Sequence, residues 1–196
     1  METSLPEIVF ASNNPHKLED ARAILAGKAK VLSLAEIVCH DDIPETADTL
    51  AGNAMIKARW VNAKYGVDCF ADDTGLMVDS LDGAPGVYSA RFAGEHCSPD
   101  DNMALLLEKL KNEKNRKAKF VTVVALILGN EEFLFNGEVT GKIAEKHSGT
   151  AGFGYDPIFI PEGFDISFAE MTSTRKNSIS HRGRAMAQLA NFIESL

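Results

Sequence analysis

Two adjacent carboxylates, Asp72 and Asp73, follow an apolar run and precede Thr74-Gly75. We expect a strand over 68–71 that ends at this pair, because the cluster Asp-Asp-Thr-Gly is rich in turn-forming residues. The end of a strand is where α/β sheets usually present active groups. Side chains alternate between the two faces of an extended chain, so only one of the two carboxylates should face a given cleft.

A second group of carboxylates lies in the acidic loop 40-HDDIPETADT-49, which includes Glu45. A hard cation such as Mg²⁺ binds a few carboxylates and shares the phosphates of a substrate. A solvated acidic surface is the alternative interpretation of this loop.

The run 10-FASNNPHKLEDARAIL-25 predicts a strand over about 7–11 and a helix over about 15–26. Asn14 suits the N-cap of that helix, and Pro15 suits its first position.

Positive charge at the start of this helix is unusual, because the helix dipole favours acidic side chains there. His16 and Lys17 nevertheless occupy the first turn. A bound phosphate would make this charge favourable, since the unpaired N–H groups of a helix N-terminus bind anions. The side chains of Ser12, Asn13 and Asn14 add hydrogen-bonding groups. A lysine that points into solvent is the alternative.

Another lysine, Lys57, falls on the apolar stripe of a helix predicted over 49–64. Asn53 lies one turn before Lys57, so the two side chains can meet. A buried lysine normally needs an anionic partner. The alternative is a lysine whose charged end extends to solvent past its neighbours.

The segment 152-GFGYD-156 places aromatic side chains among glycines, which let a backbone approach a flat ligand closely. Phe153 or Tyr155 could stack on a base, and Asp156 could accept hydrogen bonds from ring N–H groups. A tight turn with core aromatics is the alternative. The later segment 175-RKNSISHRGR-184 is dense in donors suited to keto and phosphate oxygens.

Composition narrows the class of protein. The chain has 196 residues, 45% hydrophobic and 24% charged, which predicts one globular domain over 1–196, with two closely joined lobes as the alternative. A net charge of -8 argues against nucleic-acid binding, and the short basic patch 114-KNRKAK-119 is interpreted as a solvated connection. Three separated cysteines without a Cys-x-x-Cys pair argue against zinc and favour a reduced, cytoplasmic setting. We expect neither a signal peptide nor membrane attachment.

The remaining pattern is typical of an α/β protein. We expect a short strand over 31–34, a loop over 82–96, a helix from Ser98 to about Leu110 and a last helix from about His181 to Leu196. The β-prone run 120–128 and its hairpin partner 131–139 predict a mixed sheet, because a hairpin rules out an all-parallel one.

Five stretches in this order resemble the inosine triphosphate pyrophosphatase family over essentially the whole chain. They are FASNNPHKLEDARAIL, GNAMIKA, FADDTGLMVDSLDGAPGVYSARFAG, GFGYDPIF and SISHRG. The resemblance implies a mixed central sheet with flanking helices, two lobes around a central cleft and a homodimer. It implies Mg²⁺-dependent hydrolysis of ITP, dITP and XTP, small-molecule purine nucleoside triphosphates, to the monophosphate and pyrophosphate, which cleanses the nucleotide pool.

The resemblance also implies roles for particular residues. Asp73 is the catalytic base and a metal ligand, and Glu45 is the second metal ligand. The residues implied to contact substrate are Ser12, Asn13, Asn14, Pro15, His16, Lys17, Lys57, Thr74, Phe153, Gly154, Tyr155, Asp156, Lys176, His181 and Arg182. Gly52 departs from the family, in which Glu is usual, and Thr74 stands where Ser is commoner. A pyrophosphatase of other modified nucleotides and a non-catalytic nucleotide sensor are the alternative functions.

Overall fold

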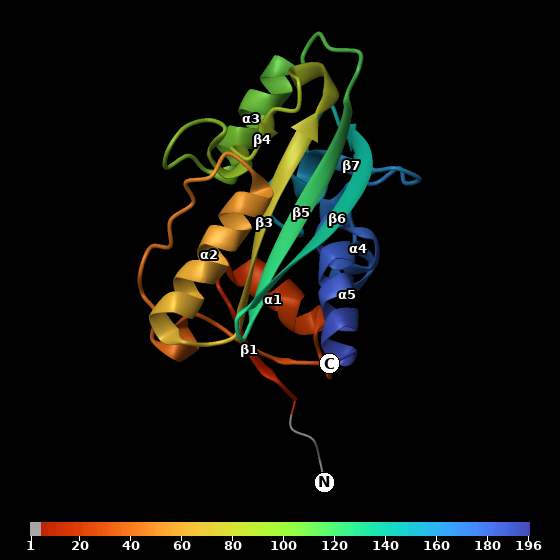
Figure 1. The fold of residues 1–196 in the computed structure, drawn as a ribbon. Coiled ribbons are helices and arrows are strands. Elements are labelled where there is room, and N and C mark those ends of the chain that lie inside the picture. Colours follow the sequence, from red (N-terminus) through yellow and green to blue (C-terminus); the bar gives the residue numbers. More distant parts are fainter. Residues whose placement is uncertain (1–4) are drawn as a thin grey trace. The chain divides into compact units, whose positions relative to one another are not determined.

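The computed structural model describes residues 5–196, which form five α-helices and one seven-stranded sheet (Figure 1). The elements in chain order are β1 (Glu7–Phe10), α1 (Pro15–Ile24), β2 (Lys30–Leu32), α2 (Leu50–Tyr65), β3 (Cys69–Val78), β4 (Pro85–Gly86), α3 (Pro99–Lys109), β5 (Lys117–Leu128), β6 (Glu131–Ile143), β7 (Phe159–Pro161), α4 (Ser173–Ile179) and α5 (His181–Glu194).

The sheet is mixed, as the sequence predicts. Its strand order is β2-β1-β3-β5-β6-β7, and β4 pairs with β3. β1 is parallel to both β2 and β3, whereas the β3–β4 and β6–β7 pairs are antiparallel. The protein is therefore an α/β protein with a mixed central sheet and flanking helices.

The chain divides into two compact units, and β3, β5 and β6 each contribute to both. Unit 1 comprises the segment that ends at Asp73, Thr122–Gly137 and Arg182–Leu196. Unit 2 comprises Thr74–Val121 and Glu138–His181. The single domain expected over 1–196 stays a prediction.

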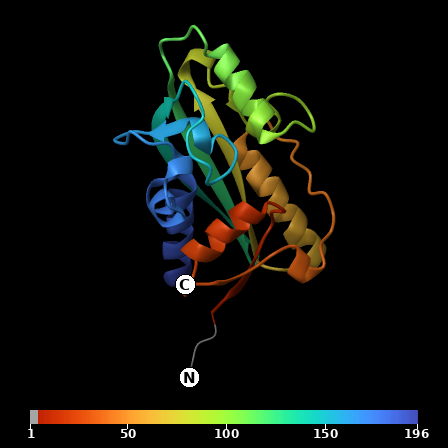
Figure 2. The same cartoon turned by 180° about the vertical axis from the view of Figure 1, so that it is seen from behind.

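Unit 1 is a sheet covered by helices on both faces. Helices α1 and α5 cover one face of this sheet (Figure 2). Their apolar side chains pack there with Phe10 and Phe70, whose ring centroids are 4.6 Å apart. α2 packs on the other face, against Cys69 and Ala71 among others. Successive residues of β3 thus alternate between the α1/α5 face and the α2 face, as the pleat of a strand requires.

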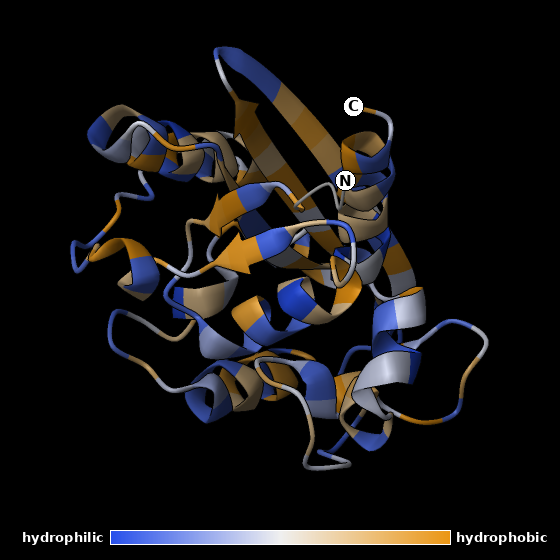
Figure 3. Ribbon diagram, turned by 90° about the horizontal axis from the view of Figure 1, so that it is seen from below, coloured by the Kyte–Doolittle hydropathy of each residue, from blue (hydrophilic) through white to orange (hydrophobic). Residues whose placement is uncertain are grey.

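Unit 2 has its own core, built around α3 and a group of aromatic rings. α3 begins as predicted, because Ser98 and Asp101 form a reciprocal capping box. Phe120 lies 4.7 Å from Phe159 and 6.4 Å from Phe168, measured between ring centroids. The helices of the chain alternate between polar and apolar residues (Figure 3), which is the pattern of helices that cover a core on one side.

Three expectations from the sequence are wrong. The strand expected to end at Asp72 runs on to Val78. Both carboxylates can lie within a strand because Asp72 has an ion-pair partner, Lys17, and Asp73 accepts a hydrogen bond from Asn53. The basic patch 114–119 is not only a connection, since its second half belongs to β5. The segment 82–96 contains the short strand β4.

The sequence analysis also missed α4, a helix of 7 residues capped by Thr172. None of the helices within residues 5–196 is both long and apolar enough to cross a membrane.

Candidate active site

The start of α1 is built as its sequence predicts. The Asn14 side chain accepts hydrogen bonds from the backbone N–H groups of His16 and Lys17, at 3.0 and 3.2 Å, and Pro15 opens the helix. The Ser12 hydroxyl accepts from the Asn14 N–H at 3.2 Å. These bonds fix the first turn from which the Lys17 side chain extends.

Lys17 does not point freely into solvent, because its ammonium group lies 2.9 Å from a carboxylate oxygen of Asp72. Arg182, at the start of α5, donates from Nε to the other oxygen of Asp72 at 3.0 Å. Its Nη1 atom lies 3.4 Å from Asp20 on α1. We call Lys17, Asp20, Asp72 and Arg182 the Asp72 cluster.

The Asp72 carboxylate is fully buried, and Arg182 is 2% exposed. Burial raises the pKa of Asp72, but the positive charges of Lys17 and Arg182 outweigh it and hold that pKa well below its usual range. The carboxylate is therefore ionised and shared between two cations.

Asp73 lies on the opposite face of β3, beside α2. It accepts a hydrogen bond from the side-chain amide of Asn53 at 3.2 Å, and Lys57 Nζ is 3.9 Å away. Lys57 also forms a 2.5 Å ion pair with Glu45 of the acidic loop. Glu45, Asn53, Lys57 and Asp73 constitute the Asp73 cluster.

Lys57 is buried on the apolar stripe of α2, with 8% of its side chain exposed, and it has anionic partners as expected. The pKa of Asp73 is raised, mainly by burial and further by Glu45, although Lys57 lowers it. The two neighbouring carboxylates thus point to opposite faces, as predicted, and their pKa values are shifted in opposite directions.

Unit 2 carries a third group of polar residues. Lys176 on α4 forms a buried ion pair with Asp156 at 2.5 Å, and its ammonium lies 5.0 Å from the ring centre of Phe153 and 5.7 Å from that of Phe168. Asp156 also accepts from the backbone N–H of Phe153 at 2.8 Å. We call Phe153, Asp156, Phe168 and Lys176 the Lys176 cluster.

Other members of the predicted base segment have structural partners. Tyr155 is buried, and its hydroxyl donates to the carbonyl of Ser89 at 2.8 Å. Gly152 has φ 76°, and a Cβ there would collide with the Asp156 carboxylate. Gly154 also has a positive φ, 61°. A glycine is needed at 152 so that Asp156 can fold back onto the loop.

His181 and Arg182, which the family resemblance implies both contact substrate, fall in different units. The His181 ring stacks on Phe120 in unit 2, with ring centroids 4.5 Å apart, whereas Arg182 binds Asp72 in unit 1. Thr74 follows Asp73 directly on β3. Asn13, Pro15 and His16 are exposed at the start of α1. The roles assigned to these residues stay predictions.

Sequence reasoning missed two members of these clusters, Asp20 and Phe168, and underrated two others, Asp72 and Asn53. Asp20 lies three residues after Lys17, so the two share one helix face, but its ion-pair partner, Arg182, is far away in the sequence. Asp72 was considered only as the neighbour of Asp73. Asn53 was expected to meet Lys57, but its link to Asp73 carried no signal in the sequence.

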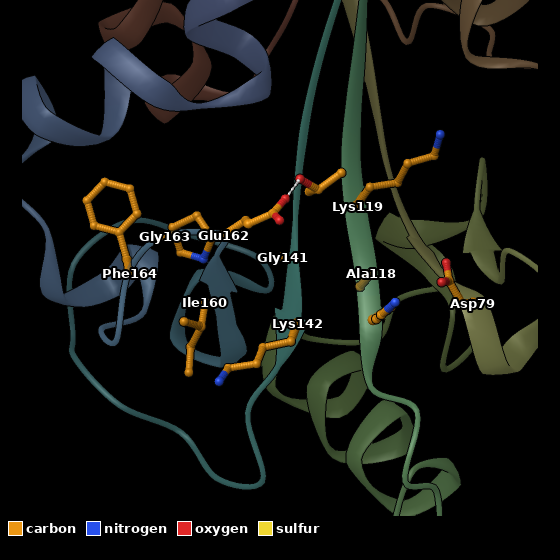
Figure 4. Close-up of a pocket in the computed structure, with 12 residues that line it drawn as sticks. Asp79, Ala118, Lys119, Gly141, Lys142, Ile160, Glu162, Gly163 and Phe164 are labelled. Carbon is orange, nitrogen blue, oxygen red and sulfur yellow. Dashed lines mark hydrogen bonds between the residues drawn. The ribbon is translucent and has the colours of Figure 1, made fainter.

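Unit 2 also contains a pocket of about 490 Å³ (Figure 4). Its lining includes Lys119, Lys142, Glu162 and Phe164. Among the residues that the structure describes, none of those that line this pocket is a predicted site residue. Lys119 and Lys142 point in different directions (Figure 4). Their side chains therefore do not converge on one ligand position.

Among residues 5–196, no three His, Cys, Asp or Glu side chains are grouped to hold a metal ion. Glu45 and Asp73 nevertheless both lie within 4.0 Å of one positive charge, the Lys57 ammonium. Two carboxylates near one cation fit Mg²⁺, which proteins usually bind through one or two carboxylates together with substrate phosphates.

An α/β protein with buried lysine–carboxylate clusters on both faces of one strand has known relatives. Residues 8–192 match the model of the Ham1 family. The chain belongs to the Ham1 family.

Relatives in this family are similar along nearly their whole length. The dITP/XTP pyrophosphatase of Flavobacterium johnsoniae is 54% identical over 95% of this chain and 97% of its own length. That of Porphyromonas gingivalis is 54% identical over 96% and 98%. The structure of a HAM1 protein from Coxiella burnetii superposes with a TM-score of 0.90 at 36% identity, covering 98% of this chain and all of the other.

Proposed function

We propose that this protein hydrolyses the non-canonical purine nucleoside triphosphates ITP, dITP and XTP to the monophosphate and pyrophosphate. Membership of the Ham1 family and the names of relatives at 54% identity support this activity. The observation that carries the proposal is the Asp73 cluster, in which Glu45 and Asp73 lie beside the buried ammonium of Lys57. Such an arrangement has ligands for a divalent cation and a donor for phosphate in one place.

Glu45 and Asp73 would hold Mg²⁺, which when bound would neutralise charge on the phosphoryl oxygens. Asp73 would orient and deprotonate the attacking water. Lys57, Lys17 and the start of α1 would bind the phosphates, because a triphosphate brings about four negative charges to a protein of net charge -8.

The Lys176 cluster would recognise the base. Hypoxanthine and xanthine have a 6-oxo acceptor where adenine has a 6-amino donor, and a lysine ammonium only donates. The ring of Phe153 would stack on any purine, and so adds affinity without selectivity. Guanine shares the 6-oxo group, so GTP has to be excluded by contacts around C2. The proposal also includes a homodimer, by family resemblance, and a reducing cytoplasm, in which Cys39, Cys69 and Cys97 stay free.

A panel of nucleoside triphosphates, with pyrophosphate release measured with and without Mg²⁺, tests the proposal. We expect release from ITP, dITP and XTP far above that from ATP, and only with the metal. Tight binding of ITP without release would favour a nucleotide sensor, and preference for another modified nucleotide would favour a different pyrophosphatase.

A further inference from the structure

Asn53 is a buried amide with partners at both ends of its side chain. It is 1% exposed, its Oδ1 accepts from the backbone N–H of Ala47 at 2.8 Å, and its Nδ2 donates to Asp73 at 3.2 Å. The opposite orientation of the amide would bring its oxygen against a carboxylate and its NH₂ against an N–H, so the chemistry of the partners fixes it.

The first of these bonds attaches the acidic loop to α2. Ala47 lies two residues after Glu45, so the position of its backbone limits where the Glu45 carboxylate can lie. Gly52, the residue before Asn53, shows independently that the acidic loop lies close to α2. A Cβ at Gly52 would lie 2.6 Å from the Ala47 Cβ and 2.8 Å from the Thr49 hydroxyl. The loop is therefore packed against α2 at a point where any side chain at 52 would displace it.

Lys57 also links the acidic loop to Asp73, one turn further along α2, but through charge. An ammonium can hold a carboxylate in many orientations, whereas an amide donates and accepts in defined directions. The two hydrogen bonds of Asn53 thus fix the direction in which the acidic loop and β3 face each other.

We propose that Asn53 is a positioning residue, which fixes the Glu45 loop and the Asp73 carboxylate relative to each other so that the two carboxylates can share one divalent cation. This role depends on the proposed function for its metal, but its first consequence, a protected Ala47 amide, needs neither metal nor substrate. Partners that orient metal ligands typically change affinity by 10–100-fold when they are removed.

The test compares Asn53→Ala with Asn62→Ala in the full chain. Asn62 is a matched control, because it lies on the same helix and its side chain donates to the Val67 carbonyl at 2.9 Å, away from the acidic loop. Two quantities are measured in the nucleotide-free protein. The first is the rate of hydrogen exchange of the Ala47 amide without metal. The second is the affinity for Mn²⁺ alone, which is monitored through the paramagnetic effect of the bound ion.

We expect Asn53→Ala to speed Ala47 exchange about tenfold and to weaken Mn²⁺ binding by roughly 10–100-fold, and Asn62→Ala to change neither. Asn53→Asp keeps an acceptor for Ala47 and should keep that amide protected. If Asn53→Ala does not fold, Asn53→Ser, whose side chain is too short to reach both partners, replaces it.

Unchanged Ala47 exchange in Asn53→Ala, or loss of protection without any loss of Mn²⁺ affinity, would overturn the proposal. Neither measurement uses turnover. An enzyme that released no pyrophosphate from any nucleotide would therefore disprove the proposed function while leaving the role of Asn53 to be decided by exchange and metal binding.

Discussion

On the two faces of β3 in unit 1, the neighbouring carboxylates Asp72 and Asp73 have different partners and opposite pKa shifts. On the α1/α5 face, Asp72 is fully buried between Lys17 and Arg182, and its pKa is held low. On the α2 face, Asp73 has a neutral amide as its close partner and a more distant ammonium, and its pKa is raised. The first carboxylate has its charge neutralised by the fold, whereas the second is left able to attract a cation or a proton.

The largest effect that this comparison predicts is on Asp73. We expect Asp73→Asn to lower kcat for ITP by about 10²–10⁴-fold, the usual contribution of a general base. Because burial disfavours the charge at this position, the variant should unfold at the same temperature as the wild type or slightly higher. Steady-state kinetics and thermal unfolding measure the two quantities. A variant that kept more than about a tenth of wild-type kcat would remove the catalytic role.

The substitution Asp72→Asn, one residue earlier, should lower the stability of the fold. Asp72→Asn leaves the buried Arg182 and the partly buried Lys17 without their carboxylate. Breaking a buried ion pair in this way typically costs about 3–5 kcal/mol of the free energy of unfolding. Denaturant unfolding at neutral pH measures it. A lowered pKa stabilises the folded state above the ordinary carboxyl value of about 3.9, and this contribution is lost as the pH falls below that value. The difference between the two proteins should therefore shrink in acid, and a difference independent of pH would contradict the assignment.

Two lysines extend the comparison to unit 2. Lys57→Ala should slow the hydrolysis of ITP and ATP alike, by roughly 10–100-fold, because it removes the charged group that we propose donates to phosphate. Lys176→Ala should instead narrow the ITP/ATP ratio of kcat/KM, because it removes the proposed donor to the 6-oxo group. Measuring kcat/KM for both substrates separates the two roles. If Lys57→Ala changed the ratio more than Lys176→Ala, phosphate and base recognition would have been assigned to the wrong clusters.

The smallest effect is expected at Tyr155. Tyr155→Phe removes the hydrogen bond to the Ser89 carbonyl inside the core of unit 2, which should cost about 1 kcal/mol of stability. The ITP/ATP ratio should not change, because the hydroxyl is used within the protein. A changed ratio would show that Tyr155 contacts the base after all.

Local sequence patterns predicted most elements that have local causes. The cap at Asn14, the helix start at Ser98 and the hairpin that follows the run 120–128 all depend on residues within a few positions of each other. The predicted end of β3 was wrong because the side chains that bind the two aspartates inside the strand come from α1, α2 and α5. The link between Asn53 and Asp73, and that between Arg182 and Asp72, join distant positions in the chain, so no local spacing could show them.

The Asp72 cluster also affects the order in which the protein can be completed during synthesis. Lys17 and Asp72 lie in the first half of the chain, but Arg182 belongs to the C-terminal helix. A nascent chain that has not yet released this helix from the ribosome lacks one of the two cations beside the buried carboxylate. The α1/α5 face of β3 also lacks the apolar side chains of α5 until then. Unit 1 therefore completes its folding only after α5 has emerged from the ribosome, and a truncated chain that lacks α5 is expected to be a substrate for cellular proteases.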